Sequence, residues 1–321
     1  MLGESKCREV LKKAIEYAAA DKVEAKLVGE NFNLTRFANS TIHQNMNRVL
    51  SELQVRVVIG KRIGVATTNN FDDESIKKVV DKAMLLAKVA EENHDFETFP
   101  EASEYQNTKN FYKETAEYSA DQRAEDIAKI TEHADKYGFS VFGAHITTQD
   151  EIAIMNSEGV DAYDLSTYAY LRTVVEGPQG TGYADMLDRN VVNINADAIG
   201  REAVERCQMA QNPQPLETGE YEVVFLPYAV ADIIRFPAYI GFGGQPFEEG
   251  RSYMAKKMGQ QIMGKNISIW DDPFDVNTLN SPFDVEGVPK KKVDIIKSGV
   301  ASGVVYDYST ATKYKKEATG H

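Results

Sequence analysis

The chain has 321 residues, and its 49 Asp and Glu outnumber its 36 Lys and Arg to give a formal net charge of −13. This acidic balance disfavours nucleic acid as a ligand, because binding to phosphates needs a basic surface that releases counterions. With 42% hydrophobic and 26% charged residues, the composition is typical of a globular protein and excludes a disordered or fibrous chain. The length predicts about two domains.

Cysteine usage and the N-terminus bear on the cellular compartment. Cys7 and Cys207 form no C-x-x-C pair and suggest no disulfide framework, which favours a reducing environment. The N-terminus lacks the apolar core of a signal peptide, and nowhere do 18 apolar residues run together. We therefore expect a cytoplasmic protein without a membrane segment. Both cysteines fall on the apolar face of a predicted helix, so we expect buried packing thiols.

The first predicted unit is a helix, a set of strands and a second helix. Apolar residues at three- and four-residue spacing predict a helix over residues 7–18. Alternating apolar residues from 23 to 63 predict a small antiparallel sheet, with turns at 39–40 and 60–61. Asp72 and Asp73 are candidate N-caps for a helix that ends near residue 90.

After a polar connector, the same order of elements returns. The pattern predicts a helix over residues 127–137, strands over 139–175 and a closing helix with Asn195 as its cap. Landmarks of the first unit recur in the second at offsets of 116 to 118 residues: Asn39 as Asn156, Arg56 as Arg172 and Gly64 as Gly182. Such steady offsets predict a duplication.

A third block follows the Pro-rich stretch at residues 212–215. Its pattern predicts a strand over 221–226, a helix over 229–240 and short strands after 267. The predicted fold class is α+β, a duplicated helix–antiparallel strands–helix region followed by a mainly β C-terminal domain. The predicted boundaries are 1–92 for the first unit, 93–120 for the connector, 121–215 for the second unit and 216–321 for the third block.

No catalytic or metal-binding constellation is visible in the residues alone. The five histidines are far apart in sequence and make no H-E-x-x-H motif. The carboxylates around Asp271 fit no EF-hand and are better explained as turn residues. Neither a G-x-S-x-G elbow nor a phosphate-binding glycine loop is present.

Four segments of the chain resemble the TldD/PmbA family. They are residues 35–45, 283–289, 303–313 and 318–321, and they follow the order of that family from one end of the chain to the other. The resemblance implies a first block, a related second block and a C-terminal block. It also implies that the family's C-terminal block continues beyond residue 321, so that this part of the fold is expected to be incomplete here.

The resemblance further separates two branches of the family. In the TldD branch, the helix after the first strand of the C-terminal block carries H-E-x-x-x-H, a zinc site for peptide hydrolysis. The matching helix here, residues 227–234, reads P-Y-A-V-A-D-I-I and offers Asp232 alone, whereas zinc needs three or four protein ligands. The chain therefore resembles the PmbA branch, also called TldE.

This branch implies a subunit without catalytic residues or a cofactor of its own. Its implied partner is a homologous TldD-like subunit that holds zinc, or a second copy in a homodimer, and the implied substrate is a small peptide. Two alternatives stay open. The chain could be a peptidase in its own right, using Asp232, Asp284, Glu286 or ligands further along, or a regulator that binds gyrase or an antitoxin without proteolysis.

Seven residues at motif positions or in polar turns are candidate substrate contacts. Turn geometry, strand packing or plain solvation explains each of them at least as well. The candidates are Arg36, Asn39, His43, Asn45, Arg251, Asp284 and Glu286.

Overall fold

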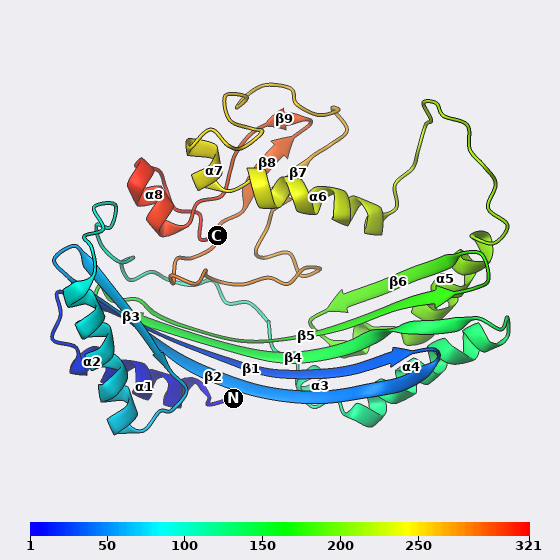
Figure 1. Ribbon diagram of the computed structural model, residues 1–321. Helices are drawn as coiled ribbons and strands as arrows, with labels where there is room; N and C mark the ends of the chain where they lie inside the picture. Colours follow the sequence, from blue (N-terminus) through cyan, green and yellow to red (C-terminus); the bar gives the residue numbers. More distant parts are fainter.

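The computed structural model describes residues 1–321, and its centre is one long antiparallel sheet (Figure 1). The six strands lie in the order β3-β2-β1-β4-β5-β6. The first unit supplies α1 (Glu4–Tyr17), β1 (Lys22–Ala38), β2 (Thr41–Ile59), β3 (Arg62–Thr68) and α2 (Asp73–Val89). The second supplies α3 (Lys113–Ala116), α4 (Ala120–Asp135), β4 (Ser140–Asn156), β5 (Asp161–Glu176), β6 (Thr181–Asp188), η1 (Val191–Asn193) and α5 (Ala196–Met209).

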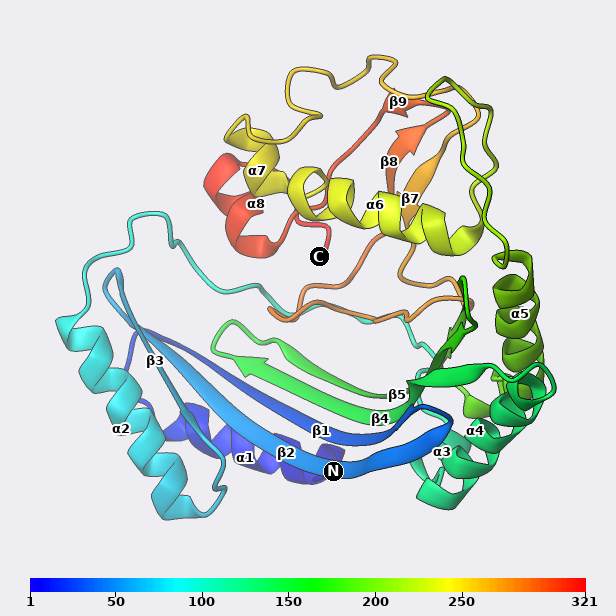
Figure 2. The same ribbon diagram turned by 45° about the vertical axis from the view of Figure 1, so that its right-hand side comes forward.

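The two units share this sheet, where the sequence pattern predicted a small sheet for the first. β1 pairs with β4 from Glu24↔Asn156 to Phe37↔Gly143, so the duplicated halves meet at the middle of the sheet. The sheet is strongly bent, with α1 and α2 covering one end of its convex face and α4 and α5 the other (Figures 1 and 2). The concave face is left to the third block.

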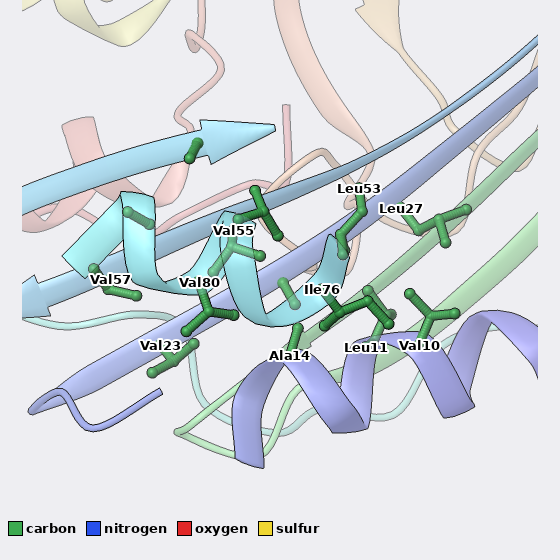
Figure 3. Close-up of a cluster of buried hydrophobic side chains, with 14 of the residues drawn as sticks. Val10, Leu11, Ala14, Val23, Leu27, Leu53, Val55, Val57, Ile76 and Val80 are labelled. Atoms are coloured by element: carbon green, nitrogen blue, oxygen red, sulfur yellow. The ribbon is translucent and has the colours of Figure 1, made fainter. Parts of the chain in front are cut away.

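Each unit has its own apolar core between helices and convex face. In the first, side chains of α1, β1, β2 and α2 interdigitate (Figure 3). Asp72 caps α2 by accepting a hydrogen bond from the Ser75 N–H, as predicted. Asn195 caps α5 in the same way, which confirms the closing helix of the second unit. Cys7 and Cys207 are both buried in these cores, also as predicted.

Two equivalent glycines allow close packing of a strand against a helix within each unit. A Cβ on Gly64 of β3 would lie 2.0 Å from the Ala83 carbonyl oxygen of α2. A Cβ on Gly182 of β6 would lie 2.0 Å from the Ala203 carbonyl oxygen of α5. The third strand of each unit therefore touches its closing helix backbone to backbone, and the matching glycines reflect a shared packing requirement.

The third block contains less strand than the sequence pattern suggested. Its strands are short and its helices hold more residues: α6 (Pro227–Gly241), α7 (Gly244–Glu248), β7 (Ile269–Asp271), β8 (Val293–Lys297), β9 (Val300–Ala301) and α8 (Tyr308–Tyr314). The predicted strand over 221–226 is absent, and all six residues are exposed irregular chain. A strand needs a neighbour for its backbone groups, and none lies beside this segment. Not one helix combines the length and apolar character that a membrane crossing requires.

Candidate functional site in the cleft between sheet and third block

A cleft of about 280 Å³ lies between the concave face of the sheet and the third block. Alternate residues of β1 and β2 face the same side of the sheet, and one such set of side chains points into the cleft. The sheet contributes Glu24, Lys26, Gln54 and Arg56. The third block contributes Asp284, Val285, Glu286, Asp307, Ser309 and His321.

On the sheet side, the cleft contains an ion pair between a buried carboxylate and a partly exposed guanidinium. Glu24 and Arg56 are opposite each other in the β1–β2 register, and the Arg56 Nη2 lies 2.9 Å from the Glu24 Oε2. The Arg56 guanidinium also lies over the Phe99 ring, 4.6 Å from its centroid. Burial raises the pKa of the Glu24 carboxyl, and the charge of Arg56 opposes that rise.

On the third-block side, two carboxyls share one turn. Asp284 Oδ1 accepts hydrogen bonds from the N–H groups of Glu286 and Val288, both at 2.9 Å. Asp284 Oδ2 is buried without a hydrogen-bond partner. Glu286 Oε2 accepts from the Tyr308 N–H at 2.9 Å. Burial raises the pKa of both carboxyls, and Asp284 raises that of Glu286 further.

The loop that carries these carboxyls is anchored to the sheet. Phe283 is 3% exposed and packs with Ile154, Val160 and Ala162 of the β4–β5 hairpin. The Tyr105 hydroxyl, from the connector, donates a hydrogen bond of 2.7 Å to the Gly287 carbonyl. The loop is therefore held from the sheet and from the connector, which fixes the carboxyls at the cleft.

A second, larger hollow of about 600 Å³ lies further along the same sheet. Its polar lining includes Glu30, Glu52 and Asp150, and its apolar lining is Val28, Leu50 and Ile152. Burial raises the pKa of the Asp150 carboxyl, and the charge of Glu30 adds to the rise. No Lys, Arg or His lines this hollow.

Of the seven predicted residues, only Asp284 and Glu286 line the cleft. Asn39 and Ser40 form the β1–β2 turn with φ of 48° and 59°, and Asn45 Oδ1 accepts from the Thr35 hydroxyl at 2.9 Å. His43 is exposed on the same hairpin. The remaining two pair locally: Arg36 with Gln44 at 3.5 Å, and Arg251 with Glu249 at 2.8 Å. A substrate role for these five stays a prediction.

Sequence reasoning missed the sheet side of the cleft. Glu24 and Arg56 belong to alternating strands, where a charged residue is the expected occupant of a solvent-facing position. Their opposed register, visible only once β1 and β2 are paired, was the one signal that could have found them. Asp307 was likewise missed, and it caps α8 by accepting from the Thr310 N–H.

The residues present on α6 do not fit the zinc site that the family's TldD branch carries. Asp232 is exposed on that helix, and neither His nor Glu accompanies it. No three His, Cys, Asp or Glu side chains of the chain gather in a group that could hold a metal ion.

Models of known protein families match this chain. Residues 23–87 match the PmbA/TldA metallopeptidase domain 1, residues 103–210 its central domain and residues 218–321 its C-terminal domain. These three matches cover most of the chain in the family's order. The protein is therefore metallopeptidase-related, and the chain belongs to the PmbA/TldD family.

Individual relatives agree with this assignment. An uncharacterised Methanocaldococcus jannaschii protein is 25% identical over 83% of this chain, and the Haemophilus influenzae metalloprotease PmbA homologue is 24% identical over 84%. The chain spans 62% of the length of each. The crystal structure of Thermococcus kodakarensis TldE has the same fold, with a TM-score of 0.88 and 24% identity over 98% of this chain and 73% of that one.

Proposed function

We propose that this chain is a PmbA/TldE-like subunit that binds peptide for a TldD-type metallopeptidase and has no catalytic residues of its own. The proposal rests on two observations: an acidic cleft lies between the sheet and the third block, and α6 offers no zinc ligand set. The named relatives include metalloproteases, so a zinc-bearing homologous subunit would supply the hydrolysis. A homodimer is the alternative assembly.

The chemistry of the cleft and of α6 supports peptide binding by this chain and hydrolysis by a partner. Zinc-dependent hydrolysis needs a set of three or four protein ligands, and neither α6 nor the cleft of this chain offers one. Exposed backbone groups can bind an extended peptide through main-chain hydrogen bonds, and carboxyls favour its positively charged groups. A cytoplasmic location is part of the proposal, since both cysteines are free thiols.

A mixing experiment tests the proposal. A synthetic peptide is incubated with this chain alone, with a TldD-type homologue alone and with both, and the products are read by mass spectrometry. We expect no cleavage by this chain and faster cleavage by the mixture than by the homologue. Cleavage by this chain alone would favour the self-sufficient peptidase. Binding of gyrase or an antitoxin without cleavage in any mixture would favour the regulator.

A further inference from the structure

The outer edge of β2 is bare for most of its length. β3 pairs with β2 only from Leu53↔Thr68 to Ile59↔Arg62, so residues 41–52 have β1 on one side and no strand on the other. Ten of these twelve residues are exposed, including Val49 at 58% and Leu50 at 52%. Unpaired strand edges of this length are templates for pairing, and the segment has no proline or lysine to block them.

The second unit shows how the equivalent edge is used. There β6 pairs only with residues 169–176 of β5, and the connector lies along the remainder. The Thr167 N–H donates to the Asn110 carbonyl at 3.0 Å, and the Tyr112 N–H donates to the Thr167 hydroxyl at 3.1 Å. An irregular, extended part of the chain thus occupies the edge of the second unit.

The duplication shows which residue of the first unit corresponds to Thr167. Val57 pairs with Gly64 as Val175 pairs with Gly182, which is an offset of 118 between the units, so Thr167 corresponds to Val49. The antiparallel register directs the N–H groups of alternate β2 residues away from β1, and Val49 and Ser51 both belong to that set. No strand pairs with them there, whereas the Asn110 carbonyl accepts from the Thr167 N–H in the second unit.

The chemistry beside this edge is acidic and apolar. Leu50, Ser51 and Glu52 line the hollow of about 600 Å³ on the concave face, together with Glu30 and Asp150. Glu52 takes part in no ion pair, while Glu30 pairs with Arg48 at 2.5 Å. A strand added at the edge would place alternate side chains over this hollow, where a cation meets a surplus of carboxylates.

We infer that the free edge of β2 binds an extended peptide by strand addition, and that the hollow beside it selects basic side chains at alternate positions. The inference rests on the proposed peptide-binding function and names the location and the substrate class. The backbone groups around Ser51 supply affinity. The carboxylates of Glu52 and Asp150 supply the preference for Lys or Arg.

The test compares two fluorescein-labelled decapeptides, one alternating Thr and Lys and one alternating Thr and Glu, by fluorescence anisotropy. We expect the Lys peptide to bind at least about tenfold more tightly at low salt, with the difference shrinking as salt rises. Ser51→Pro removes the outward N–H and should weaken binding at least about tenfold. Ser51→Ala keeps the N–H and should bind like the parent protein.

A second variant keeps the test independent of folding at position 51. Glu52 is exposed, so Glu52→Arg leaves the fold intact and should lower the Lys-to-Glu affinity ratio at least about threefold. Equal affinities for the two peptides, or a folded Ser51→Pro protein that binds normally, would overturn the inference alone. A dimer that Ser51→Pro dissociates, with no peptide bound, would assign the edge to a second copy. If neither peptide binds and a TldD-type homologue gains nothing in the mixture, the proposed function itself fails.

Discussion

His145 is a buried residue that makes the stability of the protein depend on pH. Its side chain has no exposed surface, neither ring nitrogen has a hydrogen-bond partner, and Asp126 Oδ2 is 3.7 Å from Nδ1. Burial lowers its pKa from 6.5 to about 4. Between these values the unfolded chain binds a proton that the folded chain does not, so stability falls by about 3 kcal/mol as pH drops through this window.

Replacing this imidazole should remove that dependence. His145→Phe keeps a ring of similar shape beside Tyr118, whose ring centroid is 5.7 Å away, and loses no hydrogen bond. We expect the free energy of unfolding, measured with urea at pH 7 and pH 4.5, to differ less in the variant than in the parent protein. A variant that keeps the whole difference would show that other groups cause it.

Asp284 has the opposite dependence. Because burial raises its pKa, the folded state keeps a proton that the unfolded chain has released, and stability falls as pH rises through the folded pKa. Asp284→Asn retains an oxygen for the N–H groups of Glu286 and Val288. The variant should be more stable than the parent at pH 8 by urea unfolding and should weaken peptide binding at the cleft. Lower stability at pH 8 would contradict this reasoning.

At the scale of elements, the close contact of β6 with α5 gives a stability prediction. Gly182→Ala would force a Cβ to within 2.0 Å of the Ala203 carbonyl, so strand and helix must separate. We expect a loss of about 1–3 kcal/mol, with a similar loss for Gly64→Ala. Gly243→Ala is the control, because its Cβ would meet no atom closer than 3.5 Å. Thermal unfolding that ranks all three alike would refute the shared packing requirement.

Local patterns predicted most elements of the two units, because their helices and strands have regular periods and capped ends. Asp72 and Asn195 cap the helices where the sequence placed them. The pairing of β1 with β4 could not be predicted, because the local sequence pattern of a strand does not show which other strand it pairs with. The same limit hid the cleft, whose Glu24 and Glu286 come from distant parts of the chain. The strand predicted over 221–226 was wrong for a related reason: β propensity does not produce a strand when no neighbouring strand is present to pair with it.

For the whole molecule, we expect the stability of the third block to depend on the packing of the Phe283 loop against the sheet. Phe283→Ala removes a ring that is 3% exposed and packed against the β4–β5 hairpin. We expect a loss of about 3–5 kcal/mol and faster proteolytic cleavage near residue 283. Val285→Ala, 63% exposed in the same loop, is the control and should change neither. Equal protease sensitivity of the two variants would mean that the block is held elsewhere.

The proposed function assigns peptide binding to this chain and zinc-dependent hydrolysis to a homologous partner. Zinc content per polypeptide, measured by elemental mass spectrometry on the chain purified alone and shown to be folded, tests it most directly. We expect a value near zero, because α6 offers only the exposed Asp232. Stoichiometric zinc, together with peptide hydrolysis by the chain alone, would contradict it.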